Sequence, residues 1–210
     1  MFNKEILAVL IAYLLGSVPF AYIVARATRG IDIRQTGAGN VGAMNVWREA
    51  GASAGASVLV LDAAKGSLAI LFANTLGVPL FVVMVSGVAA IIGHNWPVFL
   101  QFQGGRGAAT TLGVMLAVMP AQFGLSFFMI AGLFLATGNT GLVMGVGLIT
   151  LALAAWLTGI GKVYAAFPLV LAVLGLLRNM ADFKKELTKS NSVKTTVFGR
   201  LPLPWAKRKE

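Results

Sequence analysis

The sequence predicts an all-α integral membrane protein of about seven transmembrane helices, with its N-terminus outside and its C-terminus inside. Hydrophobic residues make up 58% of the 210 residues and charged residues only 11%, whereas a soluble domain carries about 25% charged residues. Apolar stretches recur along the chain, and about 20 apolar residues cross a bilayer as a helix. Lys and Arg gather in two regions, and cytoplasmic loops are enriched in these residues.

Each apolar stretch predicts one span. Residues 5–25 are interpreted as a first transmembrane helix rather than a cleaved signal peptide, because further spans follow. The stretch 108–136 is too long for one ordinary span and carries Pro120 near its middle, where a helix is expected to break. The predicted spans cover about 5–25, 52–74, 78–96, 108–119, 121–136, 140–160 and 162–179.

The distribution of charge decides whether 108–136 forms one span or two, and how the chain is oriented in the membrane. One basic region follows the first span, from Arg26 to Arg48, and the other follows the last span, from Arg178 onwards. With a break near Pro120 six spans separate these regions, so both lie in the cytoplasm together with Arg106. The chain is therefore expected to form a single polytopic domain over 1–210 with a basic cytoplasmic tail at 180–210.

The net charge of +10 comes mostly from that tail. A basic tail anchors the topology and contacts anionic lipid of the bilayer. Nucleic acid is not an expected partner, because no basic domain interleaved with aromatic residues is present. The chain has no cysteine, which excludes disulfides and thiolate catalysis.

Two glycine-rich segments carry the features of anion sites. The segment 37–48 ends in Arg48, and the segment 104–110 contains Arg106. Glycine lets backbone N–H groups approach a ligand, and arginine adds a planar fork of donors that suits phosphate or carboxylate. Gly37-x-Gly-x-x-Gly42 also matches a dinucleotide-binding fingerprint, but it follows a membrane helix rather than the strand that this fingerprint requires.

A few polar residues inside the spans are candidates for a structural or a chemical role. Asp62 and Lys65 lie three residues apart and share a helix face, which predicts a buried ion pair. Organisation of a substrate site and an ion pathway are the alternatives. His94, the only histidine, could serve as a structural hydrogen-bonding group at a helix end, a substrate contact or a general base. No metal or cofactor is expected.

No Ser-His-Asp grouping or pair of carboxylates is apparent. Catalysis is therefore expected to depend on positioning and electrostatics. A transporter is a further alternative, but the paired broken helices typical of transporters are not apparent in the sequence.

At the two glycine-rich segments the chain resembles the bacterial PlsY family of membrane acyltransferases. The matching motifs extend over residues 13 to about 114 with the family's spacing. They are Gly16-Ser-Val-Pro-Phe20, Gly37-x-Gly-Asn-x-Gly-Ala-x-Asn45-x-x-Arg48, Asp62-x-x-Lys-Gly66, Gly93-His-x-x-Pro-x-Phe99 and Gly104-Gly-x-Gly107-x-Ala-Thr110.

The resemblance implies transfer of an acyl group from acyl phosphate to glycerol 3-phosphate, giving lysophosphatidic acid and phosphate for phospholipid synthesis. It also implies a cell-membrane protein with seven spans and a cytoplasmic active site. Asn45 and Arg48 take the catalytic positions. The positions implied to bind substrate or phosphate are Gly37, Ala38, Gly39, Asn40, Gly42, His94, Gly104, Gly105, Arg106, Gly107, Thr110, Asn179 and Asp182.

The chain departs from the family pattern at several positions. Ala38 replaces the usual serine, Met44 the usual threonine and Arg106 the usual lysine. In the C-terminal motif Asn179 stands where the family has histidine, and Asn191 where it has glutamate. The alternative to an active enzyme is thus a catalytically impaired member of the family that binds a lipid phosphate or regulates an active paralogue.

Overall fold

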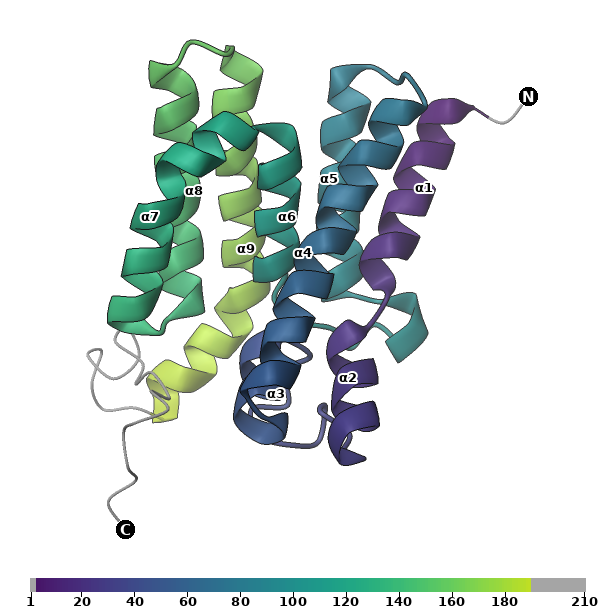
Figure 1. Ribbon diagram of the computed structural model, residues 1–210, viewed down its shortest axis with the longest axis vertical. Coiled ribbons are helices and arrows are strands. Elements are labelled where there is room, and N and C mark those ends of the chain that lie inside the picture. The colour runs from purple at the N-terminus through teal and green to yellow at the C-terminus, as the bar shows by residue number, and fades with distance from the viewer. Residues whose placement is uncertain (1–2, 190–210) are drawn as a thin grey trace. The chain divides into compact units, whose positions relative to one another are not determined.

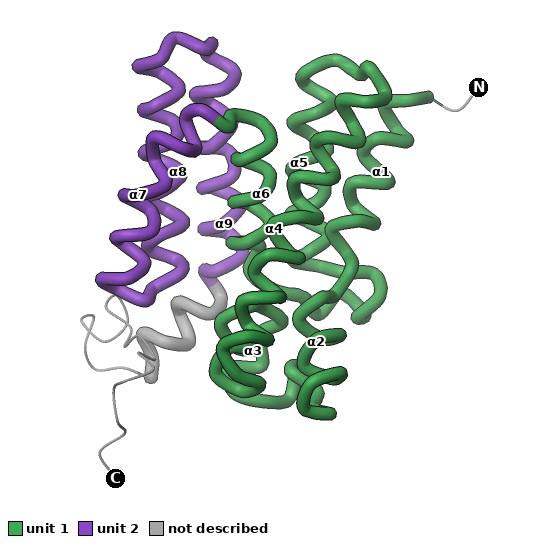
Figure 2. The backbone as a smooth tube through the Cα atoms, viewed as in Figure 1, with its two compact units in different colours: residues 1–120 green, residues 121–210 purple. Residues whose placement is uncertain are grey.

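The computed structural model describes the backbone of residues 3–189 and the side chains of residues 3–180. Over this range the regular structure is helical, with no strand. The chain divides into two compact units, residues 1–120 and 121–210, which Figure 2 distinguishes by colour. The chain is thus an all-α membrane protein, as predicted.

The first unit contains six α-helices and a short 3₁₀ turn among its described residues (Figure 1). Its elements are α1 (Lys4–Ser17), α2 (Phe20–Arg29), α3 (Ala43–Ala50), α4 (Ala52–Thr75), α5 (Leu80–Asn95), η1 (Val98–Leu100) and α6 (Ala108–Val118). The second unit contains α7 (Pro120–Thr137), α8 (Thr140–Leu157) and α9 (Lys162–Lys189).

Six helices of the described chain are long and apolar enough to cross a membrane, when α1 and α2 are counted together over Lys4–Arg29. The remaining apolar helix, α6, has 11 residues. At 1.5 Å per residue it is about 17 Å long, shorter than the roughly 30 Å hydrocarbon core. Seven full spans and their orientation therefore remain a prediction.

The break predicted near Pro120 is confirmed. Helix α6 ends at Val118 and α7 begins at Pro120. Between them Met119 has φ −143° and ψ 67°. A residue before proline is displaced from the helical region by the proline ring, so this change of direction follows from the sequence.

A second break was not predicted. In place of one helix over residues 5–25, the structure has α1 and α2, separated at Val18 and Pro19. Val18 is extended, with φ −60° and ψ 118°. The cause is again a residue that precedes proline, but here the apolar stretch continues through the break, so hydropathy gives no sign of it.

Glycines bring the helices of the first unit into close contact. A side chain at Gly16 of α1 would collide with the backbone of Ala90 in α5, and one at Gly93 of α5 would collide with the backbone of Tyr13 in α1. Helices α4 and α6 approach in the same way at Gly113. Small residues allow such approach between membrane helices.

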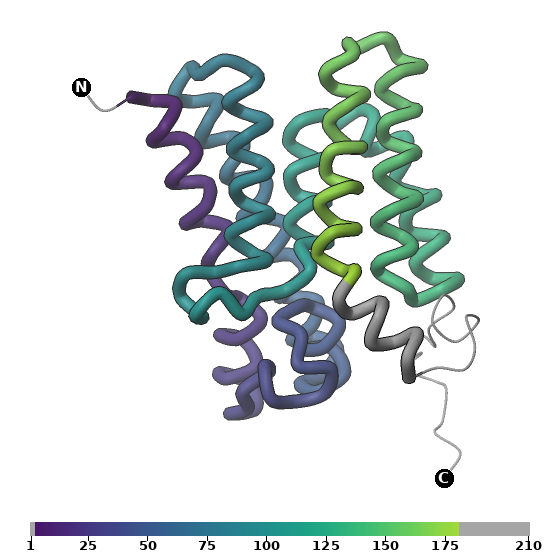
Figure 3. The backbone as a smooth tube through the Cα atoms, turned by 180° about the vertical axis from the view of Figure 1, so that it is seen from behind, coloured from purple at the N-terminus to yellow at the C-terminus, as the bar shows by residue number. Residues whose placement is uncertain are grey.

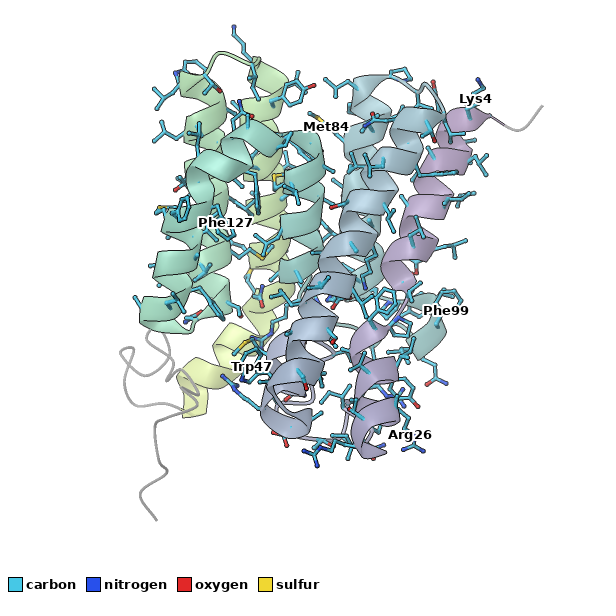
Figure 4. All side chains as sticks on the ribbon, in the orientation of Figure 1. Lys4, Arg26, Trp47, Met84, Phe99 and Phe127 are labelled. Atoms are coloured by element: carbon cyan, nitrogen blue, oxygen red, sulfur yellow. The ribbon has the colours of Figure 1, made fainter. Side chains whose placement is uncertain are left out.

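The polar end of the first unit is a separate packed layer. Helices α2 and α3 lie against the N-terminal part of α4 (Figure 1). Arg26, at the end of α2, and Trp47, on α3, mark this layer in Figure 4. Its buried core consists of Ala21, Ala25, Ile33, Val41, Val46, Ala50, Ala54, Val58 and Leu100. The first glycine-rich segment lies within this layer.

The second unit is mostly apolar on its surface. Leu125, Phe128 and Leu157 are 70%, 81% and 74% exposed, as expected for side chains that face lipid. Gln122 of α7 donates to the hydroxyl of Thr158 after α8, at 2.9 Å. This bond joins a buried amide of α7 to an exposed hydroxyl at the end of α8, and polar side chains commonly link membrane helices in this way.

Candidate active site

An acidic turn holds the start of the first glycine-rich segment. The Arg34 guanidinium donates to the Asp32 carboxylate, with Nη2 and Oδ2 2.7 Å apart, and the Arg34 backbone N–H donates to Oδ1 at 3.0 Å. These bonds lower the Asp32 pKa from 3.8 to about 2. The Thr36 hydroxyl donates to the Asp32 carbonyl at 2.9 Å. The loop therefore starts from a fixed geometry.

Asn45 lies in the first turn of α3, and its side chain organises the rest of this loop. Its Oδ1 accepts from the backbone N–H of Ala38 at 3.0 Å. Its Nδ2 donates to the carbonyls of Ile33, Thr36 and Asn40 at 3.2, 3.0 and 3.1 Å. Asn45 is 3% exposed, so its amide is used by the loop itself. We infer that Asn45 is a positioning residue.

Two glycines give the loop its shape. Gly37 and Gly39 have φ of +62° and +67°, which glycine adopts without strain. A Cβ on Gly37 would also lie 2.5 Å from the side chains of Asn45 and Glu49. Between the glycines, Ala38 is exposed at the surface. Position 38 is thus presented outward, as a phosphate contact requires.

Several backbone donors of the loop are used internally. The N–H of Ala38 donates to Asn45, that of Gly39 to the Thr36 carbonyl at 3.1 Å, and that of Gly42 to the Asn40 carbonyl at 3.0 Å. The sequence suggested that these amides would face an anion. The structure instead uses them to hold the loop, which leaves a larger part of anion binding to side chains.

Arg48 lies one turn after Asn45 on α3 and is exposed. Residues three apart on a helix lie on neighbouring positions of its surface. Arg48 is therefore placed beside the loop that Asn45 organises. Met44, which stands where the family has threonine, is half-buried, and its side chain carries no hydrogen-bond donor.

A cluster of charged and polar side chains is buried where α4 meets α5. The Lys65 ammonium and the Asp62 carboxylate lie 2.7 Å apart, which confirms the predicted ion pair. His94 Nδ1 lies 3.5 Å from the same carboxylate oxygen. Asp62, Lys65 and His94 are only 1%, 4% and 7% exposed. Buried charges in a membrane protein require such partners.

The second glycine-rich segment packs onto the end of α5. The Gly105 N–H donates to the carbonyl of His94 at 3.1 Å. A Cβ at Gly104 would collide with the His94 carbonyl and the Pro97 ring. Gly107 has φ +76° and begins α6. Close approach of the backbone, rather than chain flexibility, requires glycine at 104 and 105.

The two segments meet at His94. A Cβ on Gly105 would collide with His94 Nε2 on one side and lie 2.5 Å from the Val41 carbonyl on the other. Val41 belongs to the first segment and Gly105 to the second. Figure 3 shows that the connection between α5 and α6 lies at the same end of the first unit as the first segment. The structure therefore brings the two glycine-rich segments into contact at Val41 and Gly105.

Asn95 is a buried polar residue that the sequence analysis did not single out. It is 1% exposed, and in the described part of the chain neither atom of its amide has a hydrogen-bond partner. A Cβ on Gly107 would lie 2.8 Å from Asn95 Oδ1. Thr110, one turn into α6, is fully buried. The sequence signal for Asn95 was an amide directly after the apolar run of α5.

The C-terminal candidates lie in the second unit. The Asn179 amide donates to the carbonyl of Gly175, one turn earlier in α9, at 2.7 Å. The Asp182 side chain and Asn191 lie outside the described residues. The roles assigned to these positions remain predictions.

The chain is similar to known acyltransferases. A family model described as glycerol-3-phosphate acyltransferase matches residues 6–189. The glycerol-3-phosphate acyltransferase of Desulforudis audaxviator is 38% identical over 187 residues, which cover 89% of this chain and 94% of that relative. Glycerol-3-phosphate acyltransferase 4 of Dehalococcoides mccartyi is 50% identical over 137 residues. That match covers 64% of this chain and 59% of the relative, so it spans less than two thirds of the relative's length.

Two solved structures are also similar. Both are crystal structures of PlsY, an integral membrane glycerol 3-phosphate acyltransferase. Its glycerol 3-phosphate form is 33% identical, with a TM-score of 0.79, and the match covers 94% of this chain and 100% of that one. The lysophosphatidic acid form is 34% identical, with a TM-score of 0.78 and coverage of 89% and 93%. Because the family model spans nearly the whole chain and whole-length relatives agree with it, this chain belongs to the glycerol-3-phosphate acyltransferase family.

Proposed function

We propose that this chain transfers an acyl group from acyl phosphate to glycerol 3-phosphate and releases lysophosphatidic acid and inorganic phosphate. The observation that carries the proposal is the meeting of the two glycine-rich segments at His94, through Val41 and Gly105. One segment is followed by Arg48, and the other contains Arg106. Both proposed substrates carry a phosphate, so two adjacent anion sites match the two reactants.

The reaction needs little from the side chains beyond placement. The glycerol 3-phosphate hydroxyl oxygen bonds to the acyl carbonyl carbon, and the bond from that carbon to the phosphate oxygen breaks. The departing phosphate accepts the hydroxyl proton, so no protein base or covalent intermediate is required. Holding two reactants in reactive geometry is worth about 7–11 kcal/mol, and cationic donors stabilise the charge that develops.

We assign the first segment to the acyl phosphate and the second to glycerol 3-phosphate. In the first segment, Arg48 supplies the charged donor beside the surface that presents Ala38. In the second, Arg106 and the start of α6 face the acceptor, since helix N-termini attract anions. Asn95 packs beside Gly107 of this second segment, and Thr110 is its last residue.

The proposed location is the cytoplasmic face of the cell membrane, with the N-terminus outside. Support comes from the arginines of the polar layer, including Arg26, Arg29 and Arg48, which follow the first apolar helix. Cytoplasmic segments are enriched in such residues. A cytoplasmic site also has access to both soluble glycerol 3-phosphate and a membrane-bound donor.

One observation favours a second candidate function. Ala38 stands exposed where the family has a serine, and the neighbouring N–H groups are engaged within the loop. A lost hydrogen bond to a charged group weakens binding by about 1.5–3 kcal/mol. A member weakened in this way could bind a lipid phosphate without turnover.

Purified protein in lipid nanodiscs with labelled glycerol 3-phosphate tests the proposal. Palmitoyl phosphate, an acyl thioester of coenzyme A and an acyl thioester of carrier protein are supplied separately as donors. Label should enter lysophosphatidic acid with palmitoyl phosphate, and Arg48→Ala should abolish it. Label transfer only from a thioester would overturn the donor assignment. Binding of labelled glycerol 3-phosphate without transfer from any donor would support the impaired function instead.

A further inference from the structure

The buried ion pair of α4 has no task in the proposed chemistry. Asp62 and Lys65 are 1% and 4% exposed, and removing two charges from water costs several kcal/mol for each ion. An apolar pair of the same size would pack there without this cost. What such a pair can provide in return is a specific arrangement of the surrounding segments.

Lys65 holds one of the segments that meet at the site. Its ammonium donates to the carbonyl of Val18 at 2.9 Å and lies 5.7 Å from the centre of the Phe20 ring. Val18 is the break between α1 and α2. The ammonium therefore fixes the point at which α2 leaves the line of α1.

The position of helix α2 in turn determines the position of the first glycine-rich segment, because the two pack together. Ala21 and Ala25 of α2 share one buried cluster with Val41 and Val46. Val41 is the residue of the first segment that contacts Gly105. A shift of α2 would therefore move the first segment at its contact with the second.

Asp62 holds the other segment through His94. The carboxylate lies 3.5 Å from His94 Nδ1, and the opposite nitrogen of the ring, Nε2, lies against Gly105. The His94 carbonyl accepts from the Gly105 N–H. The ring is thus held between the carboxylate and the second segment, and its orientation sets the space available to Gly105.

A small cavity at this junction shows how tightly the parts are fitted. Its lining includes Val18, Val41, Asp62, Lys65 and His94, and its volume is about 10 Å³. A single water molecule needs about 10–15 Å³ of such space. The ion pair thus faces the break, the first segment and the histidine across a space of about one water.

We propose that Asp62 and Lys65 are positioning residues that fix the separation of the two glycine-rich segments. This inference rests on the proposed function, in which the segments hold the two reactants. A misplacement of about 1 Å can cost about a hundredfold in rate. The pair therefore contributes to catalysis without contacting either substrate.

Spin-label distances test the inference without depending on turnover. The chain has no cysteine, so Gln35→Cys and Gln103→Cys, at exposed positions just before the first and the second segment, carry labels without background. The labelled protein is measured in nanodiscs with and without Asp62→Asn. The variant should broaden or shift the distance distribution. Ser67→Ala is the matched control, because it removes a 2.8 Å bond from α4 to Gly113 away from the segments.

A neutral double variant, Asp62→Leu/Lys65→Met, separates positioning from loss of folding. Replacing a whole buried pair by apolar residues leaves no unpaired charge, so the fold should persist. We expect its thermal stability to stay near that of the wild type while its label distances remain disturbed. Distances like those of the wild type in both variants would overturn the inference.

Kinetics provide the second measurement. In protein that transfers label from palmitoyl phosphate, Asp62→Asn should lower kcat about tenfold to a hundredfold, and Ser67→Ala should stay within about twofold of the wild type. Equal losses in the two variants would overturn the inference. A wild type that transfers from no donor would refute the proposed function alone, since the label distances still decide whether the pair places the segments.

Discussion

The side-chain oxygen of Asn45 accepts a hydrogen bond from the backbone N–H of Ala38, 3.0 Å away. The two residues lie seven apart in sequence, on either side of the turn that Gly39 makes. The position where the family carries its serine is therefore held in place by the asparagine of the same motif.

We expect Asn45→Ala to disrupt the loop before it affects any chemistry. The substitution leaves the Ala38 N–H and three carbonyls without their partner, and a buried group left unsatisfied, such as the Ile33 carbonyl, costs about 1–3 kcal/mol. Thermal unfolding in detergent should show a clear loss of stability together with a loss of activity. The exposed Asn74→Ala should change neither. Lost activity with unchanged stability would show instead that Asn45 contacts substrate directly.

Arg48→Ala should weaken phosphate-dependent binding and leave the protein folded. Arg48 is exposed on α3, so its removal leaves no cavity, while a charge-assisted bond to phosphate is worth about 1.5–3 kcal/mol. Titration with a non-hydrolysable acyl phosphate analogue should show affinity weakened at least about tenfold. Arg48→Lys should recover part of it, and Arg29→Ala, at the end of α2, should have no effect. Normal binding by a folded Arg48→Ala protein would indicate an arginine that only extends toward the membrane surface.

The bond between Asp32 and Arg34 makes the stability of the first loop depend on pH in the acid range. Arg34 lowers the Asp32 pKa from 3.8 to about 2, so the native state favours the ionised carboxylate. The stabilisation is complete above the unfolded pKa and is lost as the pH falls from about 4 to about 2. A spin label at Gln35→Cys should become more mobile over this range and stay constant between pH 5 and about 8. With Asp32→Asn, the mobility should show no step in the acid range.

Cysteine labelling on the cysteine-free chain tests the topology. With seven spans and the N-terminus outside, Gln35→Cys, Gln103→Cys and Thr195→Cys should react only from the cytoplasmic side, and Asn74→Cys only from outside. Gln103 is used because Gly104 has no room for a side chain beside the His94 carbonyl. An outside reaction at either loop position contradicts the predicted orientation.

Much of the fold could be predicted because its signals are local. The excess length of the stretch 108–136 together with Pro120 indicated a break, since proline disfavours a helix interior, and a spacing of three residues placed Asp62 and Lys65 on one helix face. The break at Val18 was missed because residues 5–25 have the length of one ordinary span, so nothing required a division at Pro19. Hydropathy measures only polarity, and the chain stays apolar at Val18, where its direction changes.

The site could be predicted only as separate segments. Sequence identified both glycine-rich segments, but their contact through Val41 and Gly105 arises from tertiary packing of α2, α4 and α5. Glycine at 104 and 105 suggested ligand contact, whereas the structure needs it first for close approach to α5. The sequence assigned Asn45 to catalysis from its motif position, and the bonds of its amide within its own loop appear only in the structure.

Ala38→Ser tests whether the chain is an active enzyme with a weakened phosphate contact. Position 38 is exposed and its backbone N–H is held by Asn45, so we expect the loop surface to accommodate the added hydroxyl. One hydrogen bond to a charged group is worth about 1.5–3 kcal/mol, so we expect acyl transfer to glycerol 3-phosphate to rise about tenfold. Ala38→Val, which adds bulk without a donor, is the matched control and should not raise it. A protein without transfer in either form supports the non-catalytic function. A decrease in Ala38→Ser would mean that the pocket is built around alanine, because an oxygen placed at a fixed, open position can lower the rate only by displacing a substrate that already fits.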